Sequence, residues 1–301
     1  MTPIWEANHV WLIFLLVTLW TGFGIAFGAI MSTLFIPLAL AALGIVLRGA
    51  NFALHKDAAR RGTRHLAGWL FGIGSVLTPF FLGAALGAVL SGRVPAGNAA
   101  GDELTSWWNL TSVSVGLLAV AMGAFLSAVY LVVEARRRGL PGLRNYFRIR
   151  AVGAGVAGLV LGAVALAALR ADERQMFDRI VGRSWALIII GVVALVATFA
   201  LAVRGATRGV RVVAAVGVAA LVWTWGVAQY PYLLPFDLTI TAGAGAAVTQ
   251  RWLLAWFVVA LLVIGPALVL LYVLDQRGEL GEDPTTSSTE DTPTPAGPVR
   301  S

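Results

Sequence analysis

The sequence predicts an all-α fold, a polytopic transmembrane helix bundle of about eight spanning helices, and three observations lead to it. Of the 301 residues, 58% are hydrophobic and only 12% are charged, whereas soluble domains carry about 25% charged residues. The apolar residues gather in runs of about 20, the length that an α-helix needs to cross the hydrocarbon core. The charged residues fall between these runs. A water-soluble enzyme of this composition would expose large apolar patches and aggregate, so that class is excluded.

Eight apolar runs are long enough to span, and residues 1–275 are expected to form one bundle. The runs lie at 9–28, 31–51, 67–90, 111–134, 151–169, 185–203, 211–229 and 252–274. Small residues four apart recur within them, at Gly68/Gly72, Gly83/Gly87 and Gly158/Gly162. We expect these pairs to let neighbouring helix backbones approach closely. Residues 276–301 are polar, acidic and rich in Pro and Thr, which predicts a disordered cytoplasmic tail.

The basic residues set the expected orientation, because loops rich in Lys and Arg stay in the cytoplasm. They are concentrated in alternate loops, after the second, fourth and sixth runs: Lys56, Arg60, Arg61, Arg64, Arg136, Arg137, Arg138, Arg144, Arg148, Arg150, Arg204, Arg208 and Arg211. The loops at 91–110 and 230–250 are poor in basic residues, and the loop at 170–184 is mixed. Both termini are therefore predicted inside. This placement accounts for the net charge of +7 without nucleic acid as a partner.

The strongest candidates for a chemical role lie near the N-terminus, in the segment Trp5-Glu6-Ala7-Asn8-His9-Val10-Trp11. An ionisable group close to membrane depth is costly and is a functional hypothesis by default. On a helix, Glu6 and His9 are three residues apart and share a face, so they could pass a proton or orient a water. The alternative is that Glu6 only stabilises the positive end of the first helix.

Haem binding can be judged by counting ligands. Haem iron takes axial His, Met, Cys or Tyr. The chain has no cysteine, three histidines and four methionines. His55 and His65 fall in a basic loop and only His9 adjoins a helix, so we expect the chain to bind no haem and no metal through its own ligands. One haem on His9 is the alternative. No phosphate-binding loop or hydrolytic triad is evident.

Aromatic residues and prolines mark one loop on the predicted outer side, Gln229–Thr239. Tyr230, Tyr232 and Phe236 suit the membrane interface. Pro231 and Pro235 are expected to end the seventh helix and stiffen the loop. A structural role is the simpler interpretation, and docking of a partner is the alternative.

Three ordered segments resemble a known family. Trp5-Glu6-Ala7-Asn8-His9-Val10-Trp11-Leu12 is similar to the W-[DE]-x-N-x-V-W-L motif of subunit II of the cytochrome bd-type quinol oxidases. The stretches Met31–Leu38 and Ile45–Ala50 are similar to its next helix, and Tyr230–Ile240 is similar to its late outer loop. The likeness extends to about Gln276. The family has nine spanning helices, with one helix ahead of the motif, so this chain departs from it at the front.

The resemblance implies a fold, a function and partners. Such oxidases take electrons from quinol and reduce dioxygen to water in the bacterial plasma membrane. Two b-type haems and one d-type haem, with the quinol-binding loop, lie in subunit I. Subunit II packs against subunit I as a heterodimer in lipid, supports it, and contributes proton and dioxygen paths. Small accessory subunits and a bound quinone are compatible with the family.

The same resemblance implies roles for individual residues. Glu6 would take the place of the family's acidic residue in a proton path from the cytoplasm. Asn8 would be its polar neighbour, with His9 beside them, and Trp11 would match a tryptophan beside a proposed dioxygen path.

Two other functions stay open at this stage. A secondary transporter could use Glu6 and His9 as a coupling site, although no internal repeat of the kind such folds show is evident. A membrane scaffold without a catalytic role is the third reading. Transport by the isolated chain in liposomes, without a haem subunit, would favour the transporter.

Overall fold

The computed structural model describes residues 2–56, 61–204 and 209–277. Of these, residues 2–9, 51–56, 61–64, 202–204, 272 and 275–277 are described by their backbone alone. The chain divides into two compact units. One contains residues 1–16 and 247–301, and the other contains residues 17–246.

Long helices dominate the described residues, as the sequence predicts. Eight of them have 20 residues or more: α1 (Thr2–Gly22), α3 (Phe35–Lys56), α4 (Arg61–Leu90), α5 (Leu110–Arg137), α6 (Pro141–Asp172), α8 (Trp185–Arg204), α9 (Val210–Gln229) and α11 (Ala247–Arg277). The shorter elements are α2 (Gly24–Thr33), α7 (Arg174–Arg183), β1 (Tyr232–Leu234), β2 (Leu238–Thr239) and α10 (Ile240–Gly243). The strands form one antiparallel hairpin.

Five of these helices, α4, α5, α6, α9 and α11, are long and apolar enough to cross a membrane by themselves. The count rises to seven if α1 with α2, and α7 with α8, each form one bent span. The described apolar part of α3, Phe35–Ala50, is shorter than these. Large apolar side chains are exposed along these helices, among them Trp69 at 71% and Leu262 at 68%. The exposed surface is therefore suited to lipid, and the protein is a membrane protein.

The first predicted run, 9–28, is wrong as a straight span. The helix ends at Gly22, and α2 departs at 118° after a single intervening residue, Phe23. Glycine on both sides of Phe23 weakens the helix here. The Gly245 N–H donates to the Gly22 carbonyl at 2.8 Å, so this carbonyl at the end of α1 has a hydrogen-bond partner. The next long helix, α3, begins at Phe35, four residues after the predicted start of the second run.

Two predicted loops are largely helical. Most of the loop at 170–184 is α7, which buries Met176 and Ile180, one turn apart. The basic loop after the fourth run is shortened, because α6 begins at Pro141, ten residues before the predicted start. Proline suits the first turn of a helix, and arginine is a good helix former, so charge alone does not mark a loop. The other predicted boundaries lie within seven residues of the observed ends.

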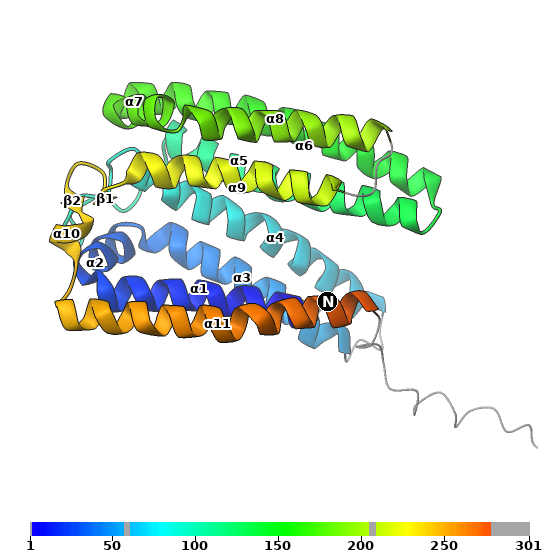
Figure 1. The fold of residues 1–301 in the computed structure, drawn as a ribbon, viewed down its shortest axis with the longest axis horizontal. Coiled ribbons are helices and arrows are strands. Elements are labelled where there is room, and N and C mark those ends of the chain that lie inside the picture. The colour runs from blue at the N-terminus through cyan, green and yellow to red at the C-terminus, as the bar shows by residue number, and fades with distance from the viewer. Residues whose placement is uncertain (1, 57–60, 205–208, 278–301) are drawn as a thin grey trace, which may run out of the picture. The chain divides into compact units, whose positions relative to one another are not determined.

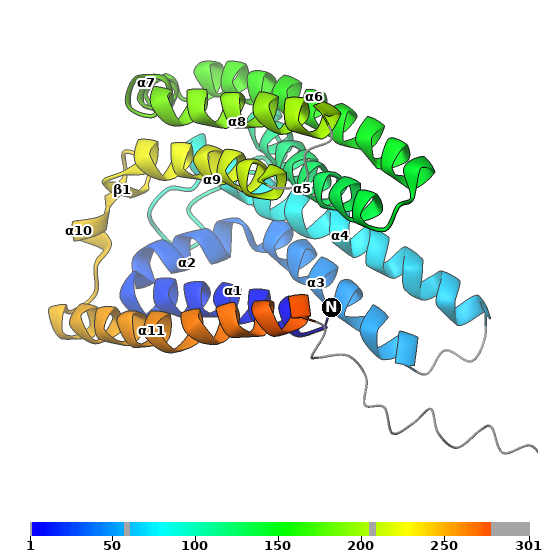
Figure 2. The ribbon, with the colours of Figure 1, turned by 45° about the vertical axis from the view of Figure 1, so that its right-hand side comes forward.

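In the unit of residues 17–246, consecutive helices pack as antiparallel neighbours. The pairs are α3 with α4, α4 with α5, α5 with α6, and α8 with α9 (Figures 1 and 2). Small and aliphatic buried residues fill the space between them, including Ala84 and Ala88 of α4 and Val129 and Val133 of α5. Residues 91–109, 172–184 and 230–245 gather at one end, here called the hairpin end (Figure 1). Residues 134–150 and 209–211 form the arginine end.

In the other unit, the first part of α1 and the helix α11 make contact through aromatic rings. Phe14 stacks on Phe257 with centroids 5.9 Å apart. None of the most apolar 18 residues in the Ala247–Leu271 stretch of α11 is buried. The tail predicted for residues 276–301 lies almost wholly outside the described residues.

Candidate functional site

The residues predicted to carry chemistry lie on one continuous helix. Glu6, Asn8 and His9 all fall within α1, so Glu6 and His9 do share a helix face. Their side chains lie outside the described residues, and their roles stay predictions. The helix has already begun at Thr2, and no acidic residue occupies its first turn.

Trp11 is the one predicted site residue whose side chain is described. It is half-buried. Its ring meets Phe14 edge to face, with centroids 6.1 Å apart and planes at 85°. Phe14 in turn stacks on Phe257 of α11. Trp11 therefore belongs to an aromatic row with Phe14 and Phe257.

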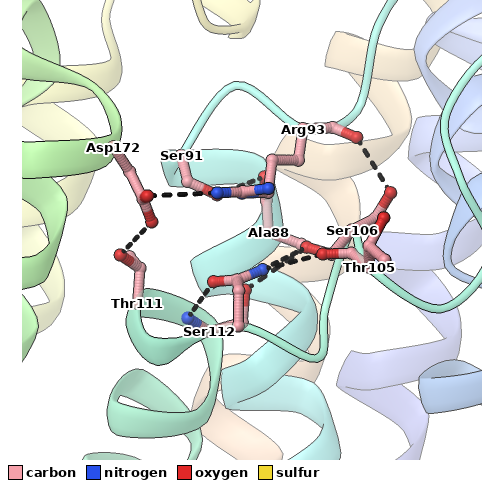
Figure 3. A network of polar contacts seen from close by, with 9 residues as sticks. Ala88, Ser91, Arg93, Thr105, Ser106, Thr111, Ser112 and Asp172 are labelled. Atoms are coloured by element: carbon pink, nitrogen blue, oxygen red, sulfur yellow. Dashed lines mark hydrogen bonds and ion pairs between the residues drawn. The ribbon is translucent and has the colours of Figure 1, made fainter.

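A polar network that the sequence did not predict ties three segments together at the hairpin end (Figure 3). Arg93, after α4, pairs with Asp172 at the end of α6, Nη2 to Oδ1 3.0 Å. The second carboxylate oxygen of Asp172 accepts from the Thr111 hydroxyl of α5 at 2.6 Å. The Asp172 side chain keeps 23% of its full exposure. A carboxylate with two partners at this exposure fixes the α6 end against α4 and α5.

The segment 91–109 is ordered by its own side chains. The Asp102 carboxylate accepts from the Leu104 and Thr105 N–H groups, at 2.9 and 2.6 Å, and from the Thr105 hydroxyl at 2.8 Å. These hydrogen bonds, with that from the Thr105 N–H the largest cause, hold the pKa of Asp102 below its ordinary value. Asn109 then caps α5 by accepting from the Ser112 N–H at 2.9 Å.

Two arginines of α7 bind the aromatic loop. Arg179 and Arg183 both donate to the Tyr230 carbonyl, at 3.0 and 3.2 Å. The Arg179 guanidinium also lies 5.1 Å from the centroid of the Tyr232 ring and 5.7 Å from that of Phe236. The sequence offered a signal for this contact, since arginines in a predicted outer loop contradict the positive-inside pattern and call for a local partner. The arginines of α7 thus hold the aromatic loop in place.

The arginine end holds its own charge cluster. Glu134 of α5 pairs with Arg138, Oε1 to Nε 2.8 Å, and with Arg211 of α9, Oε2 to Nη2 3.4 Å. The Arg211 guanidinium lies 5.1 Å from the centroid of the Tyr130 ring. The pairs join α5 to the first turn of α9.

Arg48 is a charged residue on an otherwise apolar stretch of α3, within the segment Ile45–Ala50. Its guanidinium lies 5.3 Å from the centroid of the Phe71 ring of α4. Its Nε is buried and has no hydrogen-bond partner among the described residues. A cation on an apolar helix of a membrane protein is a functional signal.

Among the described residues, no three side chains of His, Cys, Asp or Glu lie close enough to hold a metal ion. Met176, a residue type that can ligate haem iron, is fully buried among apolar side chains of α4, α6 and α9. The side chain of His9, the candidate haem ligand in the sequence, lies outside the described residues.

Comparison with known proteins agrees with the fold. The sequence matches the family model of cytochrome bd terminal oxidase subunit II over residues 1–275. It is similar to cytochrome bd ubiquinol oxidase subunit 2 of Bacillus subtilis (strain 168), with 26% identity over 179 residues, 59% of this chain and 51% of the relative. That match spans about half the length of the relative.

Among solved structures, the chain is similar to one in the bd oxidase from Geobacillus thermodenitrificans, with a TM-score of 0.71. The sequence identity is 24%, and the match covers 91% of this chain and 83% of that one, a likeness of fold. The family model covers all the described residues except the last two of α11. The chain therefore belongs to the cytochrome bd terminal oxidase subunit II family.

Proposed function

We propose that this chain works as subunit II of a bd-type quinol:dioxygen oxidoreductase in the bacterial plasma membrane. The observation that carries the proposal is the family match over residues 1–275, which includes the Trp5–Leu12 motif within one helix. In this role the chain forms a heterodimer with a haem-bearing subunit I. It supports that subunit and shapes the routes by which protons and dioxygen arrive.

The division of labour follows from the ligands available. Two b-type haems and one d-type haem in subunit I would carry electrons from quinol to dioxygen. This chain, with no cysteine and three histidines, is proposed to contribute no redox centre. Its contribution is to pack, to exclude water and to position protonatable groups.

The proposed proton path begins at α1. Reduction of dioxygen to water consumes protons at a site removed from bulk water. Protons therefore need ionisable groups within hydrogen-bonding reach of one another. We assign the Glu6 carboxylate as the relay, with Asn8 as a polar neighbour that can hold a water and His9 on the same helix face. The predicted inside location of both termini would make the cytoplasm the proton source.

The proposed dioxygen path uses the aromatic row on the same helix. Dioxygen is apolar and dissolves in the hydrocarbon core, so it can approach between helices. The Trp11 ring, half-buried and edge to face with Phe14, supplies an apolar wall one turn beyond the carboxylate. Protons and dioxygen would then follow different faces of α1.

The experiment is to express the chain with an affinity tag after Ser301 in cells deleted for the native gene. Solubilised membranes are purified on the tag, and the product is analysed for a haem-bearing partner, reduced-minus-oxidised haem spectra and quinol-dependent oxygen consumption. We expect a stoichiometric partner that carries the haems, together with quinol oxidase activity. A pure chain without a haem partner that catalyses solute transport in liposomes would overturn the proposal.

A further inference from the structure

The first three turns of α6 reach beyond the hydrocarbon core. The helix has 32 residues, so at about 1.5 Å per residue it is roughly 48 Å long, whereas the core is about 30 Å thick. The excess is about 12 residues. It falls at the N-terminal end, because Arg144, Arg148 and Arg150 stand in the first ten residues and the apolar run follows. This segment, Pro141–Arg150, therefore lies at the level of the lipid headgroups.

Two arginines of this segment line a hollow. Pro141, Arg144, Asn145 and Arg148, all from the first turns of α6, line a half-open hollow of about 180 Å³. The Arg144 and Arg148 side chains are half-buried. Being four residues apart, they lie on one helix face with Cβ atoms about 6 Å apart. Arg148 Nη2 donates to Asn145 Oδ1 at 2.9 Å, which holds its guanidinium beside the hollow.

The charge of the hollow is not neutralised within the described part of the chain. Glu134 is the one acidic residue at the arginine end, and its carboxylate already forms ion pairs with Arg138 and Arg211. The ion pairs of the described residues include neither Arg144 nor Arg148. Two guanidinium groups that point at one cavity without a carboxylate favour an anion with several oxygens, as a phosphate has.

Exposed apolar side chains lie on a neighbouring face of the same helix. Leu143, Tyr146 and Ile149 are exposed by 46%, 48% and 61%. Farther along α6, Val156 and Val160 are exposed by 55% and 57%. A phosphate site at headgroup level, beside an exposed apolar helix face, has the two chemistries of a phospholipid. A soluble phosphate or nucleotide would use the arginines alone.

We propose that Pro141–Arg150 binds one anionic phospholipid, with its phosphate between Arg144 and Arg148 and an acyl chain along Ile149 and Val156. The lipid supplies the negative charge that the chain lacks at this end and stabilises the protruding start of α6. This inference is independent of the oxidase proposal, because it concerns neither protons nor dioxygen.

The test uses the intact complex as purified, in native mass spectrometry with added phosphatidylglycerol or phosphatidylcholine. The variant Arg144→Gln/Arg148→Gln is compared with Arg136→Gln/Arg137→Gln, which removes the same charge from exposed positions at the end of α5. Each basic residue near an anionic surface contributes about 1 kcal/mol, so the first variant, which loses two, should bind phosphatidylglycerol on the order of thirty-fold more weakly. The second should change little. Equal weakening in both variants would show a diffuse charge effect and overturn the site.

A second measurement uses the unmodified complex, so it does not depend on how the variants fold. A photoactivatable phosphatidylglycerol analogue is crosslinked in nanodiscs and the labelled peptides are mapped. We expect label within residues 141–160, reduced by unlabelled phosphatidylglycerol but not by phosphatidylcholine, inorganic phosphate or ATP. Label confined to other helices, or crosslinking of a partner subunit at Arg144 and Arg148 in place of lipid, would overturn the proposal. So would displacement by ATP, which would identify a soluble anion.

Discussion

Gly87 of α4 lies against the backbone of Ser112 of α5, where a Cβ added at Gly87 would stand 2.5 Å from the Ser112 Cα. One turn away, a Cβ at Gly83 would stand 2.9 Å from the Gly116 Cα. These two glycines let the backbones of α4 and α5 touch. In lipid, such close packing is a main source of helix association, because no hydrophobic drive operates between helices.

The Gly87 contact predicts that Gly87→Ala destabilises the protein. Real Cβ atoms do not approach backbone this closely, so α4 and α5 must separate, at a cost of about 1–3 kcal/mol. The matched control is Gly72→Ala on the same helix, where no atom lies within 4 Å of an added Cβ. Thermal denaturation of the purified complex should show a lower midpoint for Gly87→Ala alone. Equal midpoints would contradict the close approach.

The three glycine pairs show what a spacing can and cannot predict. Only Gly83/Gly87 makes the expected backbone contact. Within the described residues, an added Cβ at Gly68, Gly72, Gly158 or Gly162 meets nothing. The spacing gives a smooth helix face, but whether another helix lies against that face is long-range information. Conversely, a Cβ at Gly74 would lie 2.5 Å from the Gly44 carbonyl oxygen, a contact without any spacing signature.

Helix positions were predictable because apolar run length reports the membrane thickness directly. The break at Phe23 was not, because hydropathy is the same on both sides and only the flanking glycines mark it. α7 was missed for the opposite reason. Its arginines suggested a loop, and its helical character depends on burial of Met176 and Ile180 beneath them.

The α7 arginines make a prediction about the hairpin. Arg179→Gln removes a hydrogen bond to the Tyr230 carbonyl and two ring contacts, worth together about 1–2 kcal/mol. Hydrogen exchange of residues 230–239 should therefore accelerate. Arg174→Gln, at an exposed position of the same helix, should leave the exchange unchanged. Acceleration in both variants would point to a general effect of charge on α7.

Asp102 makes segment 91–109 sensitive to acid. Its pKa is lowered in the folded state by the hydrogen bonds from Thr105 and Leu104. A lowered carboxyl pKa adds stability above the unfolded value, near 3.8, and that stability is lost as the pH falls through the folded pKa. Peptic cleavage of this segment should therefore rise in the wild type only below the ordinary Asp range. In Asp102→Ala cleavage should be high already at pH values where the wild type resists, and a parallel pH profile in both proteins would refute the assignment.

In the candidate site, as in the fold, local features were predictable from the sequence and long-range contacts were not. Glu6, Asn8, His9 and Trp11 were singled out because they form a dense polar and aromatic cluster on one short segment. The contacts of Arg93 with Asp172 and of Arg179 with Tyr230 were not, because their partners lie 79 and 51 residues away. Local spacing cannot bring such residues together, whereas the ends of neighbouring spans do.

Glu6 carries the most direct functional prediction. If its carboxylate relays protons, Glu6→Ala should lower quinol-dependent oxygen consumption by roughly a hundred-fold or more, within the 10²–10⁴ range of positioned proton transfer, while haem content stays intact. Glu6→Asp keeps the acid and should retain much of the activity. Glu103→Ala, at an exposed position of segment 91–109, is the control for loss of a carboxylate as such. Unchanged turnover in Glu6→Ala would defeat the relay, and equal loss in the Ala and Asp variants would assign Glu6 to packing, because only a proton-carrying role distinguishes an acid from its absence.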